Sequence, residues 1–352
     1  MIDIIGEYWT TALFGAIGGL VLGLAARLGR FCTMGAIEDL LYGGSDIRMR
    51  MWVLAIGIGI LGCFGLTGAG MMQPEASYYL SIRWMPLASI LGGLTFGYGM
   101  ALAGNCGYGA IARLGGGDFR AFVIVLVTGV AAYATLSGPL APLRNMAFPQ
   151  VDVTSEVPPG IAHFLGRALG LSPVHIGLSL GALITLGALG SRLFLQDPKS
   201  IFWGIVVGLA ITSGWAGSYY AATAGFEDLP VVSHSFSAPV GETLIYYMTA
   251  SVREPSFAVG SITGVALGAF IGSLIKGHFR WEACDDPREL RRQIIGAGLM
   301  GIGAVLALGC TVGQGMTAFS TLAWSAPVTF AAIFAGAALG LRQLIEGFQP
   351  AE

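Results

Sequence analysis

The sequence predicts an all-α integral membrane protein with about nine transmembrane helices and additional re-entrant half-helices, arranged as two inverted repeats. Three observations support this fold class. Only 11% of the 352 residues are charged, whereas a soluble domain carries about 25% charged residues. Long apolar runs recur along the chain, and the mean hydropathy is +0.74. Cysteines follow glycine-rich apolar runs in three similar segments, "RFCTMGAI", "GNCGYGAI" and "LGCTVGQG".

Net charge and glycine content also bear on what the chain binds and how its helices pack. The formal net charge is −2, so nothing in the charge balance favours nucleic-acid binding. The 55 glycines are about twice the usual share of ~7%. In a membrane, glycines let helices pack backbone against backbone. Gly-xxx-Gly steps occur in the first apolar run, at Gly15, Gly19 and Gly23, and again from Gly260 to Gly272.

Nine apolar runs are long enough to cross a hydrocarbon core of about 30 Å. The predicted spans are 9–28, 50–70, 84–104, 119–140, 173–193, 199–218, 256–275, 292–309 and 326–344. The acidic start "MIDIIGEYWT" lacks the basic region of a signal peptide, so the first run is interpreted as a true span. With the N-terminus outside, 14 of the 18 Lys and Arg residues lie inside, which the positive-inside rule favours.

The order of the spans predicts internal symmetry within a single transmembrane domain, residues 1–352. Residues 1–140 form a first inverted half, 141–198 a linker with the fifth span, and 199–352 a second inverted half. Such repeats are common in transporters with a central site. Residues 18–37 align without gaps on 92–111, matching at Cys32 and Cys106. A third copy keeps Cys310, and the fourth has Trp215 near the cysteine position.

The segments that follow each cysteine, 33–42, 107–114 and 311–323, are apolar but too short to span a bilayer. A longer segment, 219–255, contains another short helix. We expect re-entrant half-helices, because irregular backbone at membrane depth must be buried in protein or line a cavity. The N-termini of half-helices present free N–H groups and partial positive charge, which suit an anion.

The cysteines form no CxxC pair and no metal-like spacing, so we expect no metal and no cofactor. Cys32, Cys106 and Cys310 recur at one repeat position and are the candidate path residues. A buried thiol stays neutral and polarizable, so it does not repel an anion and is a good neighbour for another sulfur. Cys63 and Cys284 fit no repeat and are interpreted as incidental.

Four other residues are candidates for the path. Arg30, like Arg27, precedes Cys32 and is either part of the path or a cation at the inner membrane surface. Asn105 and Gln314 adjoin the thiols, and each either donates N–H to an oxyanion or caps a helix break. Trp215 is a candidate wall of the pore in the quarter without cysteine. The four histidines fall in predicted loops or at span edges, so no buried proton relay is expected.

These motifs resemble the YeeE/YedE sulphur-transport family, and the resemblance covers almost the whole chain. It implies nine spans with re-entrant loops in an hourglass-like pore, and uptake of thiosulfate or a related anion across the bacterial inner membrane. It also implies that Cys32, Cys106 and Cys310 line the path through transient S–H···S contacts. The N-terminus is then periplasmic and the C-terminus cytoplasmic. A separate small cytosolic sulfur-carrier protein is an implied partner. The segments 141–170 and 219–255 look less like the family pattern.

Two other classes remain open from the residues. A membrane-embedded sulfurtransferase or thiol-redox protein needs an activated, accessible thiol, and Arg30 near Cys32 is the one hint of it. A membrane scaffold leaves the repeated cysteines unexplained. Another sulfur species, or a selenium species, is an alternative substrate. The reading that the sequence favours is a transporter and not an enzyme.

Overall fold

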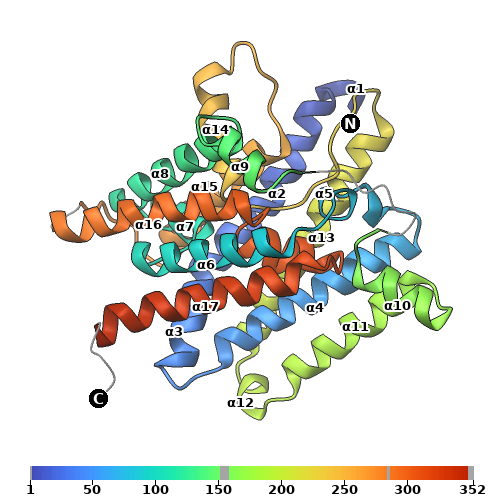
Figure 1. Cartoon of the computed structure of the whole chain (residues 1–352), viewed down its shortest axis with the longest axis horizontal. Helices are drawn as coiled ribbons and strands as arrows, with labels where there is room; N and C mark the ends of the chain where they lie inside the picture. Colours follow the sequence, from blue (N-terminus) through green and yellow to red (C-terminus); the bar gives the residue numbers. More distant parts are fainter. Residues whose placement is uncertain (1, 151–157, 284–285, 348–352) are drawn as a thin grey trace.

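Long helices occupy all nine apolar runs in the computed structural model, which describes residues 2–150, 158–283 and 286–347 (Figure 1). These helices are α2 (Glu7–Leu28), α4 (Ile47–Gly68), α6 (Pro86–Ala103), α8 (Phe119–Leu136), α11 (Pro173–Leu189), α13 (Pro198–Ala224), α15 (Phe257–Ile275), α16 (Pro287–Leu306) and α17 (Ser325–Glu346). Seven of the helices in the described ranges are long and apolar enough to cross a membrane. The bent pair α10–α11, with 116° between its helices, makes up to eight. This confirms an all-α membrane protein.

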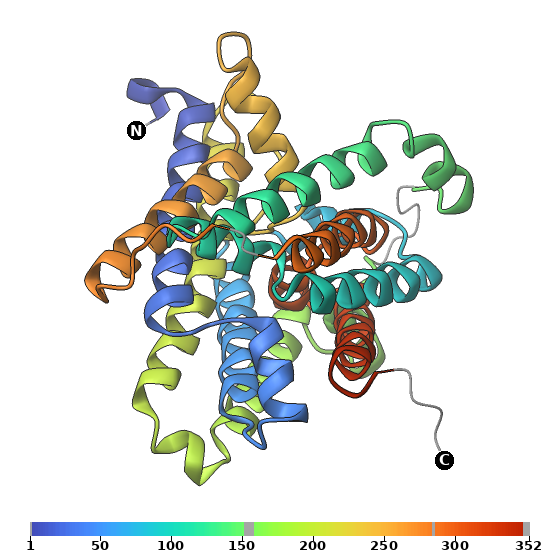
Figure 2. The ribbon, with the colours of Figure 1, turned by 90° about the vertical axis from the view of Figure 1, so that its left-hand side faces the viewer.

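Shorter elements connect or follow the long helices. They are α1 (Ile2–Ile5), α3 (Thr33–Leu41), the 3-10 turn η1 (Pro74–Ala76), α5 (Tyr78–Ser81), α7 (Gly107–Gly115), α9 (Ala141–Ala147), α10 (Ile161–Leu169), α12 (Arg192–Leu195), α14 (Ala238–Thr249) and the π-helical η2 (Gly313–Ala318). The described residues contain isolated β-bridges but no strand. In the two perpendicular views the start of α2 and the end of α17 lie at opposite ends of the molecule (Figures 1 and 2).

Helices α2 and α15 pack backbone against backbone through their glycines. A Cβ atom at Gly19 would overlap the carbonyl group of Ser261, and one at Gly264 would overlap the carbonyl of Ala16. Because the Gly-xxx-Gly steps repeat about once per turn, each helix turn offers a glycine to the carbonyls of the other helix. The glycines of the first and seventh spans therefore form one shared interface.

Each long helix before α11 packs against a helix after α11, and the pairs match when the two halves of the chain are interchanged. Helix α2 packs on α15, and α13 packs on α4 in the same way; α6 packs on α17, and α16 packs on α8. Helices α2 and α13 contact each other and run in opposite directions (Figures 1 and 2). The helices before and after α11 thus interleave rather than forming separate bodies, and the division at residues 140 and 198 stays a prediction.

In the fourth quarter-unit the helix break does not lie at the position that the sequence alignment predicted. Helix α13 continues to Ala224 before the chain breaks, and the half-helix α14 begins only after residues 225–237. Trp215 therefore lies within a continuous helix and not at a break, because the helix runs about two turns past the position aligned with the cysteines. Ser237, the N-cap residue of α14, takes the place that the cysteines take elsewhere.

Candidate functional site

Each of the three repeated cysteines directly precedes a short helical segment and receives its first hydrogen bond. The carbonyl groups of Cys32, Cys106 and Cys310 accept from the backbone N–H groups four residues later, at 3.1, 2.8 and 2.8 Å. Cys32 and Cys106 are the N-cap residues of α3 and α7, and Cys310 precedes helical residues 311–320. The same local geometry thus places three thiols at the positive ends of half-helices.

A left-handed residue creates each of these breaks. Arg30, Gly104 and Leu308 stand two positions before the cysteines and have φ values of 55°, 76° and 58°. This conformation ends the preceding helix and turns the chain toward the half-helix. Only Gly104 adopts it without a Cβ penalty, since non-glycine residues are disfavoured in this region. Two of the three breaks therefore carry backbone strain.

The buried sulfur atoms accept backbone N–H groups. The N–H of Gly109 donates to Sγ of Cys106 at 3.5 Å, which caps α7. Sγ of Cys310 accepts from the N–H of Gly313 at 3.4 Å and from the N–H of Phe236 at 3.3 Å. Phe236 belongs to the segment before α14. The fourth quarter-unit therefore supplies a backbone donor to a thiol of the third.

The three thiols are neighbours in space. Sγ of Cys106 lies 4.0 Å from the hydroxyl oxygen of Thr33, the residue after Cys32. Cys106 lies close to both Cys32 and Cys310, and Thr311 lies beside it. The hydroxyl of Ser235 lies 3.8 Å from Sγ of Cys310 on the other side. Contacts therefore connect Ser235 with Cys310, and Cys106 with the neighbours of both Cys310 and Cys32.

Two cavities approach this row from opposite ends of α2. The first, of about 320 Å³, is lined by Tyr8 and Thr11 at the start of α2 and by Trp215, Ser235 and Tyr79; we name it the Trp215 cavity. The second, of about 330 Å³, lies at the end of α2 and is lined by Cys32, Asn105 and Arg30 among others; we name it the Cys32 cavity.

The three repeated cysteines differ in their exposure to solvent. Cys106 is 0% exposed and Cys310 is 1% exposed, whereas Cys32 is half-buried. Ser235 lines one cavity and Cys32 the other. The thiols of Cys310 and Cys106 are thus buried, and neither of them lines either cavity.

The other predicted site residues lie on both sides of these buried thiols. The Nε1–H of Trp215 donates to the hydroxyl of Ser320 at 2.8 Å, which fixes the ring in the wall of the Trp215 cavity. Arg30 lines the Cys32 cavity and is exposed. Asn105 is 2% exposed, and its Oδ1 has no hydrogen-bond partner within the described residues. Asn105 thus offers a buried acceptor beside Cys106.

Gln314 caps a helix break in this structure. Its Nε2 donates to the carbonyl groups of Ala307 and Leu308 at 2.8 and 3.2 Å, at the end of α16. Both amide hydrogens are therefore engaged. Its buried Oε1 has no partner in the part of the chain that the structure describes. The geometry is that of the capping alternative.

Sequence reasoning missed several residues at the site. Thr33, Thr311 and Ser235 carry hydroxyls next to the thiols, and the repeated pair Cys-Thr at Cys32 and Cys310 was the available signal. His234 lies in a non-helical segment, as predicted, but this segment is buried. It is 0% exposed, and its Nδ1 lies 2.7 Å from the hydroxyl of Ser261, because the segment before α14 folds into the core instead of remaining a surface loop.

The sequence predicts that Cys63 and Cys284 are incidental and that no metal is bound. Sγ of Cys63 donates to Sδ of Met72 at 3.7 Å inside the core and lines neither cavity. Cys284 lies outside the described residues. Within the described ranges no group of three or more His, Cys, Asp or Glu side chains has the arrangement of a metal site.

The chain is similar in sequence to known proteins. A family model described as sulphur transport matches residues 28–339. The chain is 29% identical over 340 residues to the thiosulfate transporter TsuA of Spirochaeta thermophila, covering 92% of this chain and 95% of that protein. It is 26% identical over 325 residues to the thiosulfate transporter TsuA of Escherichia coli, covering 89% of this chain and 88% of that protein.

Proposed function

Since the chain belongs to the sulphur transport family, we propose that it takes up thiosulfate, or a related sulfur-containing anion, across the bacterial inner membrane. The anion enters through the Trp215 cavity, passes Cys310 and Cys106, and leaves past Cys32 into the Cys32 cavity. The observation that carries this proposal is the row of thiols between two cavities at opposite ends of α2. The two relatives named as thiosulfate transporters support the substrate.

The thiols of Cys310 and Cys106 and the hydroxyls beside them suit a soft divalent anion. Neutral thiols and hydroxyls donate weak hydrogen bonds without adding charge, and the half-helix N-termini supply partial positive charge. Conduction requires binding that is favourable enough to enter and weak enough to leave. The terminal sulfur of thiosulfate can pass from one S–H to the next. Trp215 shapes the path at the Trp215 cavity, and Asn105 and Arg30 shape it at the Cys32 cavity. Gln314 holds the helix break before Cys310.

The proposed orientation places the Trp215 cavity outside and the Cys32 cavity inside. It rests on the distribution of cations, 14 of 18 on one side. The Cys32 cavity, where Arg27, Arg30 and Lys276 gather, is then cytoplasmic. A small cytosolic sulfur-carrier protein is the proposed receiver of the anion.

A second function has one specific observation in its favour. Cys32 is half-buried in a cavity rich in cations, and an electropositive, accessible setting is where thiols become reactive. A membrane sulfurtransferase would form a persulfide there, taking the terminal sulfur of thiosulfate and releasing sulfite. Intact-protein mass spectrometry after exposure to thiosulfate distinguishes this alternative, because a persulfide adds one sulfur mass to Cys32.

Uptake of radiolabelled thiosulfate into proteoliposomes containing the full chain tests the main proposal. We expect uptake that saturates with thiosulfate and that protein-free vesicles do not show. A panel of sulfate, sulfite and selenium-containing anions as competitors then defines the substrate. The proposal fails if these proteoliposomes accumulate thiosulfate no faster than protein-free vesicles.

A further inference from the structure

The Cys32 cavity concentrates positive charge around a half-exposed thiol. Its volume is about 330 Å³, and its charged lining residues are Arg27, Arg30, Arg48, Arg113 and Lys276, with His278 beside them. No Asp or Glu lines it in the part of the chain that the structure describes. Cations held together in a confined space without countercharge repel each other and attract anions.

Only one of these cations has an ion-pair partner within the described residues. Nη1 of Arg48 lies 3.0 Å from Oδ2 of Asp39. The described residues hold no ion pair for Arg27, Arg30, Arg113 or Lys276. The Nε of Arg27 is buried and lacks a hydrogen-bond partner there. A buried guanidinium donor without an acceptor is costly unless a ligand supplies one.

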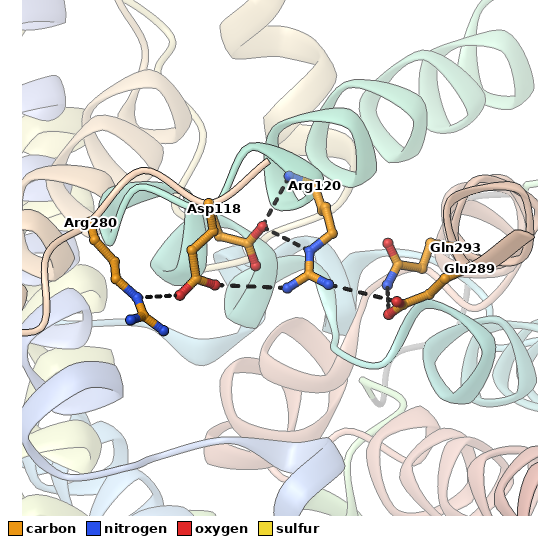
Figure 3. A network of polar contacts seen from close by, with 6 residues as sticks. Asp118, Arg120, Arg280, Glu289 and Gln293 are labelled. Carbon is orange, nitrogen blue, oxygen red and sulfur yellow. Dashed lines mark hydrogen bonds and ion pairs between the residues drawn. The ribbon is translucent and has the colours of Figure 1, made fainter. Parts of the chain in front are cut away.

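The nearest carboxylates are engaged with other arginines. Asp118 and Glu282 act on Arg27 electrostatically, but they pair with Arg120 at 3.4 and 3.8 Å. Oε1 of Glu282 also lies 2.7 Å from Nε of Arg280. The ion pairs extend from Arg280 through Glu282 and Arg120 to Glu289, and Asp118 also pairs with Arg120; Figure 3 shows this network. These carboxylates thus neutralise Arg120 and Arg280, while Arg27, Arg30, Arg113 and Lys276 have no ion pair among the described residues.

Lys276 is also affected by its surroundings. It follows the last residue of α15, and its Nζ donates to the carbonyl of Arg27 at 2.5 Å. Burial, and then the charges of Lys199, Arg30 and Arg27, lower the pKa of Lys276. A dianion in the cavity would offset this repulsion, because it adds attraction to every cation around it.

We propose that the Cys32 cavity is a binding site for a divalent oxyanion, with Arg27 and Arg113 as its main ligands. The site recognises two negative charges and oxygen atoms, which guanidinium groups bind as paired hydrogen bonds. It does not require sulfur–thiol contact, so sulfate and thiosulfate bind with similar affinity. Only the role of this site rests on the proposed function: it would hold the transported anion after the anion has passed Cys32. Sulfate on the inner side would then compete with thiosulfate for the site.

The accessible thiol of Cys32 reports on this site without any transport. The assay uses purified full-length Cys284→Ser protein in detergent, so that Cys284 does not react. The reagents are two methanethiosulfonates, one with an anionic sulfonate tail and one with a cationic trimethylammonium tail. We expect the anionic reagent to modify Cys32 about tenfold faster than the cationic one, because cation-lined clefts concentrate anions by this order. Cys63, Cys106 and Cys310 are buried and should react much more slowly.

Sodium sulfate is the probe for occupancy. At constant ionic strength, with chloride as the balancing anion, we expect sulfate to slow the anionic reagent and thiosulfate to do so at similar concentrations. Arg27→Gln/Arg113→Gln should need at least about tenfold more sulfate for half-protection, as expected when charged hydrogen bonds are lost. The exposed Arg113→Gln alone should shift half-protection in the same direction and serves if the double variant does not fold. Arg192→Gln is the matched control, since Arg192 is exposed and does not line the cavity.

Several outcomes would overturn the proposal. One is equal rates for the two reagents, and another is protection by sulfate no greater than that by chloride. A third is unchanged protection in both Arg113 variants, and a fourth is loss of protection in Arg192→Gln. Protection that requires added phosphatidylglycerol would assign the site to a lipid headgroup instead. Because the assay needs no transport, its failure is distinguishable from failure of thiosulfate uptake.

Discussion

Sγ of Cys106 lies 4.0 Å from the hydroxyl of Thr33, although 73 positions separate the two residues in the chain. This contact joins the first quarter-unit to the second, and Thr311 approaches Cys106 from the third. Cys106 therefore stands where three helix breaks meet. The following predictions test this arrangement and the helix packing that produces it.

Cys106→Ala should abolish thiosulfate uptake while leaving the fold intact. The substitution removes one sulfur atom and leaves a small cavity, which costs about 1 kcal/mol of stability. Uptake in proteoliposomes and thermal unfolding in detergent measure the two effects. Cys63→Ala is the matched control, because Cys63 is equally buried but lies off the path. Uptake near the wild-type rate in Cys106→Ala would contradict the thiol path.

Cys106→Ser separates passage by weak contacts from covalent transfer. The hydroxyl of serine is similar in size but is a harder and stronger hydrogen-bond donor. We expect slow thiosulfate uptake with some residual activity, and no added sulfur mass on wild-type protein during transport. If Ser is as inactive as Ala, and a sulfur adduct on Cys32, Cys106 or Cys310 forms and disappears at the transport rate, the covalent mechanism replaces ours.

Gly104→Ala should destabilise the protein through its backbone conformation alone. Gly104 has φ of 76°, and no neighbouring atom lies within 4 Å of an added Cβ. An alanine there costs about 1–2 kcal/mol in the left-handed region. Gly298→Ala is the control, since it also has open space around an added Cβ but lies within α16, where alanine is favoured by up to about 1 kcal/mol. Equal midpoints of thermal unfolding in the two variants would refute this explanation.

Gly264→Val should weaken the contact between α2 and α15. The added side chain would collide with the carbonyl of Ala16, and overpacking of this kind costs about 1–3 kcal/mol or more. Thermal unfolding in detergent measures the loss. Gly65→Val in α4 provides the comparison, because an added Cβ there meets nothing within 4 Å. A similar loss in both variants would show that valine itself, and not the helix contact, is responsible.

Glu75, which lies outside the spans in η1, should make the stability of the protein depend on pH. Its Oε1 accepts from Nε2 of His163 at 2.6 Å, and this hydrogen bond holds the pKa of Glu75 below its ordinary value of 4.5. A lowered carboxyl pKa contributes stability above the unfolded pKa, and this contribution is lost as the pH falls through the folded pKa. The melting temperature of wild type minus that of Glu75→Gln should therefore shrink below about pH 4.5. A difference that is constant from pH 6 to pH 3 would disprove the linkage.

The sequence predicted the helices well because each span must satisfy its own backbone hydrogen bonds in lipid. Apolar length therefore indicated where helices form, and all nine predicted spans contain one. It failed for Trp215, because α13 continues past the glycines on either side of Trp215 and ends only at Ala224, so the true break lies at residues 225–237. Arg30, Gly104 and Leu308 all adopt left-handed backbone, but only the glycine could have been recognised from its residue type.

By itself, the sequence determined the all-helical membrane class, the repeated cysteines and the half-helices that follow them, because these depend on local composition and spacing. The tertiary structure decided what those elements meet. It paired the glycines of α2 with those of α15, placed Thr33 beside Cys106, and buried His234. It also separated the cations of the Cys32 cavity from the carboxylates of Figure 3. Each of these contacts joins residues far apart in the chain, and the periodicity of a single helix carries no information about its partner.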